Sequence, residues 1–128
     1  MMLKNFARTM VCISLVVAAA PSFAGFSIND NNGTLHANES FGGGSLVVSV
    51  GNFSSNHTYQ NVAFTVQVCT DLKKTNCQAP EGGPIGSLIP GQTVRPTVPA
   101  PPRLCYFTTV VADAGSVIIV FPGYCVGT

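Results

Sequence analysis

The chain has 128 residues, of which only 9% are charged, and its formal net charge is +1. This length gives one domain, and so few Lys and Arg side chains exclude a nucleic-acid binder that works through a basic patch. Because 46% of the residues are hydrophobic, an intrinsically disordered chain is also disfavoured.

The N-terminal segment has the organisation of a bacterial-type signal peptide. Two basic residues precede an apolar run over residues 10–20, and the small residue Ala24 ends the segment. The run is shorter than the ~20 apolar residues that span a bilayer, which disfavours a membrane anchor. We therefore expect cleavage after Ala24, a signal peptide over residues 1–24 and a single β-sandwich domain over 25–128, exported to the periplasm, the cell surface or the medium.

The expected mature chain is nearly neutral. It keeps four basic and five acidic side chains, so its net charge is −1. Such a balance gives no electrostatic steering toward membranes or polyanions. It also gives little repulsion between copies, which favours self-association.

Strand patterns dominate the mature chain. Ser45–Val50 and Tyr59–Cys69 alternate apolar and polar residues, as is typical of strands with one buried face. A short strand is expected over Ile85–Ile89. Leu104–Ala112 and Val117–Phe121 are rich in β-branched and aromatic residues, as is typical of strands that are buried on both faces or central in a sheet. No amphipathic helix pattern follows the signal peptide.

Clusters of Gly, Asn and Pro separate these strands and predict turns. Frequent turns among short strands are typical of an antiparallel sandwich or barrel. The predicted turns are Asn31–Gly33, Phe41–Gly44, Gly51–His57, Pro80–Pro84, Pro90–Gly91 and Asp113–Gly115.

The segment Gln92–Arg103 carries four prolines. Proline cannot donate to a strand ladder, so this segment is expected at a sheet edge or as polyproline II. Protection of an exposed edge explains these residues. A proline-rich ligand for a partner domain is the alternative.

Removal of the signal peptide leaves an even number of cysteines: Cys69, Cys77, Cys105 and Cys125. In an exported chain this indicates two disulfides. Of the three possible connectivities we favour Cys69–Cys77 with Cys105–Cys125. The chain lacks a C-x-x-C pair, and the histidines lie far from the cysteines in sequence, so a zinc site is disfavoured. We expect no metal and no cofactor.

Four features of the chain follow a recognisable order. They are a strand that ends in a Gly-Asn turn (Leu46–Asn52), a long alternating strand (Val62–Cys69), a Leu-x-Pro-Gly-Gln turn (Ser87–Val94) and a closing hairpin (Cys105–Val120). This order resembles bacterial immunoglobulin-like domains of the cell-adhesion-related, CARDB-like type. The resemblance implies an all-β fold, an immunoglobulin-like antiparallel β-sandwich, with no catalytic residues. The chain lacks the Trp and the cysteine spacing of antibody domains.

A catalytic set would have to be built around His57. Ser54 and Ser55 lie nearby in sequence, and Asp71 or Asp113 could complete a Ser-His-Asp arrangement. The chain has no G-x-S-x-G elbow, so we interpret this histidine as part of a polar loop and expect no catalytic residues. A small hydrolase is the weakest of the functional hypotheses.

Four N-x-[ST] sequons begin at asparagines in the stretch before Tyr59. Sequons that are glycosylated lie in surface loops, and the Asn, Ser and Gly content of this stretch predicts that it faces solvent. The four asparagines are Asn32, Asn38, Asn52 and Asn56.

The leading functional hypothesis is an exported, non-catalytic β-sandwich that acts as an adhesion or interaction module of the surface or envelope and binds a protein, a surface glycan or a second copy of itself. The alternative is a periplasmic inhibitor or immunity-type protein that binds an enzyme through the loop of residues 69–77. Within that loop an apolar residue lies among charges, which is the composition of a small interface. The candidate contact residues are Asp71, Leu72, Lys73 and Lys74.

Overall fold

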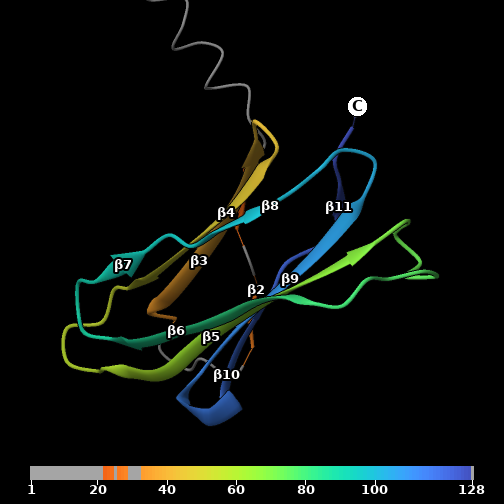
Figure 1. The fold of residues 1–128 in the computed structure, drawn as a ribbon. Helices are drawn as coiled ribbons and strands as arrows, with labels where there is room; N and C mark the ends of the chain where they lie inside the picture. Colours follow the sequence, from red (N-terminus) through yellow and green to blue (C-terminus); the bar gives the residue numbers. More distant parts are fainter. Residues whose placement is uncertain (1–21, 25, 29–32, 128) are drawn as a thin grey trace, which may run out of the picture.

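A computed structural model describes residues 22–24, 26–28 and 33–127 as two antiparallel sheets packed face to face (Figure 1). In the first sheet the order is β1-β3-β4-β7, and β8 also pairs with β4. Its strands are β1 (Ser22–Ala24), β3 (Leu35–Gly42), β4 (Ser45–Asn52), β7 (Thr93–Val94) and β8 (Thr97–Pro99).

In the second sheet the order is β2-β10-β9-β5-β6, and β11 also pairs with β9. Its strands are β2 (Phe26–Ile28), β5 (Tyr59–Cys69), β6 (Glu81–Leu88), β9 (Cys105–Ala112), β10 (Val117–Val120) and β11 (Tyr124–Cys125). A single 3₁₀ turn over Asp113–Gly115 joins β9 to β10. The predicted all-β fold, an immunoglobulin-like antiparallel sandwich with two disulfides, is confirmed. Among the described residues, none belongs to a helix with the length and hydropathy needed to cross a membrane.

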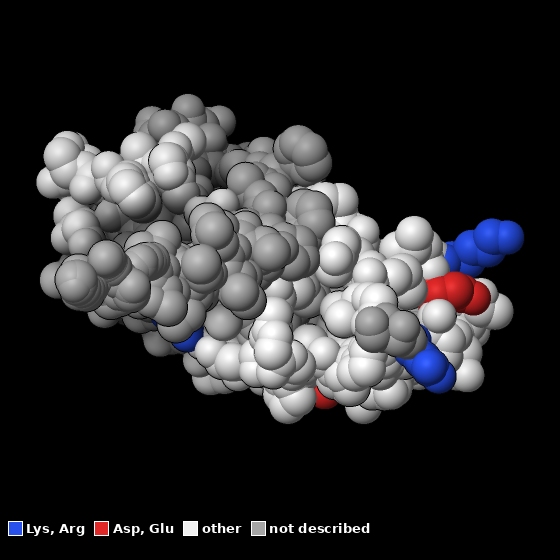
Figure 2. Space-filling view, turned by 90° about the horizontal axis from the view of Figure 1, so that it is seen from above, with Lys and Arg blue, Asp and Glu red and all other residues white. Residues whose placement is uncertain are grey.

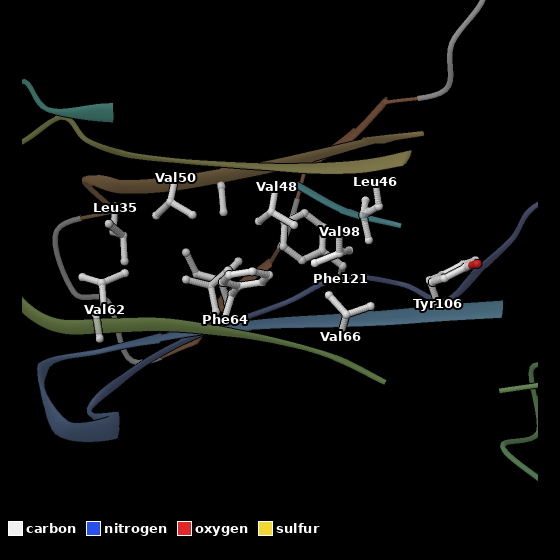
Figure 3. Packing of buried hydrophobic residues seen from close by; sticks show 14 of the residues in the cluster. Leu35, Leu46, Val48, Val50, Val62, Phe64, Val66, Val98, Tyr106 and Phe121 are labelled. Atoms are coloured by element: carbon white, nitrogen blue, oxygen red, sulfur yellow. The ribbon is translucent and has the colours of Figure 1, made fainter. Parts of the chain in front are cut away.

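The core lies between the two sheets, and it is filled mainly by alternate residues of β3, β4, β5, β9 and β10 (Figure 3). In β5 the alternation predicted a common buried face for Phe64, Val66 and Val68, and all three are buried. Strand β9 is the middle strand of the second sheet, as its composition predicted. From the first sheet, Leu46, Val48 and Val50 of β4 point toward β5 and β9 in Figure 3.

The sequence did not predict β3, and it placed the start of β6 too late. In β3 the buried positions are Leu35, Ala37, Glu39 and Phe41. An alanine and a carboxylate among them hide the period-two pattern, so the sequence predicts a solvent-facing polar segment here, and this prediction is wrong. The predicted turn over Pro80–Pro84 lies largely within β6. Glycine and proline are accepted there because β6 pairs with only one neighbour.

The proline-rich segment lies at the edge of the first sheet, as predicted. Strands β7 and β8 pair with two ends of β4, and between them the Val48 amide donates to the Pro96 carbonyl at 2.9 Å. Proline supplies acceptors here without needing to donate.

The solvent-facing prediction is also wrong for one sequon. Asn52 is buried, and its side-chain amide donates to the carbonyls of His57 at 2.7 Å and Leu88 at 2.8 Å. Asn52 therefore holds the β4–β5 turn against the end of β6. Asn38 and Asn56 are exposed, and Asn32 lies outside the described residues.

Two short strands flank the predicted cleavage site. Strand β1 pairs with β3 in the first sheet, and β2 pairs with β10 in the second. The site after Ala24 falls between them. Residues 1–21 of the predicted signal peptide, and Gly25, lie outside the described residues.

Candidate functional site

The four cysteines lie in one row across the second sheet. Cys69 of β5 is directly opposite Cys105 of β9, which is opposite Cys125 of β11, and Cys77 bridges back to Cys69. The disulfides are Cys69–Cys77 and Cys105–Cys125, so the favoured connectivity is confirmed. Two disulfides are typical of a protein from an oxidising, exported environment.

The loop closed by Cys69–Cys77 is held in one shape by Asp71. The Asp71 carboxylate accepts hydrogen bonds from the backbone amides of Lys73 at 3.0 Å and Thr75 at 3.1 Å, and from the Thr75 hydroxyl at 2.9 Å. These bonds, those from Thr75 foremost, lower the pKa of Asp71 below its usual value. At the loop base the Thr70 amide donates to the Asn76 carbonyl at 3.0 Å. Asp71 is therefore occupied within its own loop.

The loop lies over the outer face of the second sheet. The ammonium of Lys74 is 4.7 Å from the centre of the Phe107 ring. A Cβ atom at Gly123 would overlap the same ring and come within 3.0 Å of the Leu72 side chain. Glycine at position 123 thus lets the chain before β11 approach Phe107 and Leu72 closely.

A groove of about 570 Å³ opens beside this loop. Three of the four predicted contact residues, Asp71, Leu72 and Lys73, line it, whereas Lys74 is directed to Phe107 and does not. The complete lining is Thr70, Asp71, Leu72, Lys73, Arg103, Cys105, Cys125 and Val126.

Sequence reasoning missed Arg103 and Val126. The Arg103 amide donates to the Val126 carbonyl at 2.8 Å, and the Val126 amide donates to the Leu104 carbonyl at 3.0 Å. These bonds continue the β9–β11 ladder past the disulfide. The expected Cys105–Cys125 pair indicated that these two residues lie near each other, but no local pattern in the sequence placed them beside the Cys69–Cys77 loop.

The groove combines an apolar surface with positive charge. Leu72, which is 58% exposed, and Val126 supply the apolar part together with the disulfides. Lys73 and Arg103 form no ion pair with any described residue. Figure 2 shows that the charged side chains visible on this face gather mainly at one end (right), toward which the loop between β5 and β6 projects in Figure 1. This surface can accept an acidic group beside an apolar side chain.

The histidine considered for catalysis lies in a separate cluster. The Nε2 atom of His57 is 2.8 Å from the Asp113 carboxylate, so the structure brings these two residues together. The Ser54 hydroxyl, however, donates to the carbonyl of His57 and accepts from its amide, and so bonds the backbone rather than the ring. The Asp113 carboxylate also accepts a hydrogen bond from the backbone amide of Gln60 at 2.7 Å. The cluster ties the β4–β5 loop to the β9–β10 turn.

Comparison with family models, with curated proteins and with solved structures finds no match for the chain. Over the described residues, no group of three or more His, Cys, Asp or Glu side chains is placed to hold a metal ion. The resemblance to CARDB-like domains thus stays a prediction.

Proposed function

We propose that the protein is an exported, non-catalytic β-sandwich that acts as an adhesion or interaction module of the cell surface or envelope. The observation that carries this proposal is a pre-ordered loop beside a groove that presents two cations and an apolar surface. A ready-made surface loses less entropy on binding than one that must be ordered first.

The chemistry of the groove favours a protein partner that presents a carboxylate next to an apolar side chain. Lys73 and Arg103 would hold the carboxylate, and Leu72 would contact the apolar group. Asp71 keeps its negative charge, but its oxygens accept from Thr75 and the Lys73 backbone, and with Lys73 and Arg103 the lining has a net charge of 2 − 1 = +1. A neutral surface glycan would leave both cations unused.

A periplasmic inhibitor or immunity-type protein is the second candidate. It is favoured by the same loop, which a disulfide and the Asp71 hydrogen bonds fix in place, as is suitable for insertion into a partner enzyme. The two candidates differ in the partner rather than in the surface used. In the first the partner is a surface component or another copy, and in the second it is one enzyme with fixed stoichiometry.

The test is a capture experiment on the exported protein. The wild-type protein and a Lys73→Glu/Arg103→Glu variant are immobilised and exposed to the envelope fraction of the producing cells. Arg95→Glu, at an exposed position between β7 and β8, is the matched control. We expect the wild type and the control to retain the same protein and the groove variant to lose it. Retention of that protein by all three would contradict the proposal. If the retained protein is an enzyme that loses its activity when it binds this chain at a 1:1 ratio, the inhibitor candidate would be favoured.

A further inference from the structure

The four cysteines lie on the outer face of the second sheet. Cys69 follows the buried Val68 on β5. Cys105 precedes the buried Tyr106 on β9. Because successive side chains of a strand point to opposite faces, both cysteines point away from the core. Side chains of directly opposed residues share one face of a sheet, so the disulfide partners of these two cysteines lie on the outer face as well.

Three neighbouring pairs in this row are directly opposed in antiparallel register. They are Cys77 with Cys69, Cys69 with Cys105, and Cys105 with Cys125. The first and third pairs form the two disulfides, and the middle pair has the same relationship without a bond. Directly opposed Cβ atoms are about 4.5–5.5 Å apart and those of a disulfide about 3.5–4.5 Å, so a middle bond needs the strands to close by about 1 Å. A Cys69–Cys105 disulfide is therefore within reach of this backbone.

The cysteines differ in their exposure along the row. Cys69 is 0% exposed and Cys105 is 3% exposed. Cys77 is half-buried, whereas Cys125 is exposed and lines the groove that carries the two cations. Positive charge favours a thiolate over a thiol, and the thiolate is the form that attacks a disulfide. An external thiolate in the groove therefore meets Cys125 first.

We propose that this row is a site of thiol–disulfide exchange, whose co-reactant is a thiol, either a cysteine side chain of a partner protein or a small thiol. The external thiol loses its proton to water, and its thiolate attacks the Sγ atom of Cys125, forms a mixed disulfide there and displaces the thiolate of Cys105. The Cys105 thiolate attacks the Sγ atom of Cys69, forms a Cys69–Cys105 bond and displaces the thiolate of Cys77, which takes a proton from water. The number of S–S bonds is unchanged, so no oxidant or reductant is consumed.

The order of the row suits the second displacement. In such an exchange the attacking sulfur and the leaving sulfur lie on opposite sides of the sulfur between them. Cys105 and Cys77 are the two neighbours of Cys69 across the sheet, one on each side. Solvation favours the same direction, because the negative charge moves from the buried Cys105 to the half-buried Cys77.

The displaced Cys77 stays close enough to reverse the exchange. Next to it, the Gln78 amide donates to the Val68 carbonyl at 2.8 Å, and this hydrogen bond does not depend on the disulfide. Cys77 can therefore attack Cys69 again and undo both displacements, which returns the external thiol. The site thus binds a thiol covalently and reversibly. This goes beyond the proposed function, which requires only non-covalent contacts in the groove.

Peptide mapping of the exported protein after treatment with a limiting amount of reduced glutathione tests the proposal. The reaction is quenched with acid, free thiols are blocked with N-ethylmaleimide, and cleavage at Lys, Arg and Asp places each cysteine on its own peptide. We expect glutathione on Cys125, a disulfide between the Cys69 and Cys105 peptides, and N-ethylmaleimide on Cys77. Glutathione on Cys77, or a blocked Cys105 beside an intact Cys69–Cys77 bond, would overturn the proposal.

Two double variants separate the steps. Cys105→Ser/Cys125→Ser lacks the sulfur that is attacked first, so its glutathione adduct should form at least tenfold more slowly than that of the wild type. Cys69→Ser/Cys77→Ser allows the first displacement but no second, so Cys105 expels the glutathione again and the adduct at equilibrium should be at least fivefold less abundant. Equal adducts in all three proteins would contradict exchange along the row.

Non-reducing electrophoresis of protein harvested from the producing cells, with thiols blocked at harvest, identifies the source of the thiol. A partner cysteine gives a larger species that reduction removes, and a small thiol gives only its added mass on Cys125. Cys125 without a thiol adduct both here and in the glutathione treatment would overturn the proposal. Lys73→Glu/Arg103→Glu keeps all four cysteines and should reach the same bonds with glutathione more slowly. Because that variant is expected to lose non-covalent partner capture, failure of the exchange and failure of the proposed function are read separately.

Discussion

Cys69 and Cys105 occupy directly opposed positions on β5 and β9, yet each is bonded to a cysteine on its far side. The two disulfides thus extend one row of cysteines outward across the sheet, to Cys77 on one side and Cys125 on the other. The loop after β5 and the C-terminal segment are therefore anchored at the same level. The groove lies between these two anchored segments.

The two disulfides are expected to differ in their contribution to stability. They join residues 8 and 20 positions apart in sequence, and chain entropy predicts about 2.5 kcal/mol for the shorter loop and about 3.3 kcal/mol for the longer. Urea unfolding of Cys69→Ser/Cys77→Ser and Cys105→Ser/Cys125→Ser measures both. A larger loss in the first variant would show that the disulfide of the loop stabilises the fold by more than restriction of the unfolded chain.

The core assignment of β5 predicts a strong contrast between neighbouring positions. Phe64 is only 7% exposed, so Phe64→Ala should lower the free energy of unfolding by about 3–5 kcal/mol. Thr65 faces solvent, and Thr65→Ala should change it by less than about 0.5 kcal/mol. Chemical denaturation gives both values, and similar losses would be incompatible with the two faces of this strand.

Most of the fold was predictable because its main strands carry their own signals. In β5 every second residue from Val62 to Val68 is apolar, and the structure gives the predicted bounds, Tyr59–Cys69. Strand β3 could not be found in this way. Its burial depends on the hairpin with β4, and a lone strand with Glu39 among its inward residues does not show an apolar face.

Stability should fall as the pH rises toward neutrality because of Glu39. Burial raises its pKa to about 7 in the folded chain, against 4.5 for the free group. Between these values the native state holds a proton that the unfolded state has released, so the free energy of unfolding decreases with pH, by on the order of 3 kcal/mol in all. Below pH 4.5 and above pH 7 the contribution of Glu39 does not change with pH.

Urea unfolding from pH 4 to pH 8 measures that decrease. Glu39→Gln should remove most of it, whatever its effect on stability at a single pH. Glu81→Gln, on β6, is the matched control for the loss of one carboxylate. A wild-type profile that is flat or rises between pH 4.5 and 7 would show that Glu39 ionises freely in the folded protein.

Asp71 is expected to order its loop without stabilising the sandwich. Asp71→Ala removes the acceptor used by the Lys73 and Thr75 amides, so their hydrogen exchange should become at least tenfold faster. The urea midpoint should not move, because the disulfide and the strands remain. Since the pKa of Asp71 is lowered, the loop should stay ordered as the pH falls through 3.8 and loosen only below it. Unchanged exchange in the variant would assign the loop order to the disulfide alone.

Three of the eight residues that line the groove were predicted from the sequence as contact residues. The charged loop with its single leucine identified Asp71, Leu72 and Lys73, which do line the groove. Arg103 lies 30 positions after Lys73 in the chain, and it reaches the groove through pairing of the C-terminal segment with the start of β9. Such a long-range approach leaves no local pattern in the sequence.

In the proposed function the groove beside the disulfide loop binds the partner. The most direct measurement is calorimetric titration of the captured partner into the wild type, Lys73→Glu/Arg103→Glu and Arg95→Glu, with folding verified for each. We predict equal affinity for the wild type and Arg95→Glu, and at least tenfold weaker binding by the groove variant. Equal affinity for all three would contradict the claim and place the contact elsewhere on the sandwich.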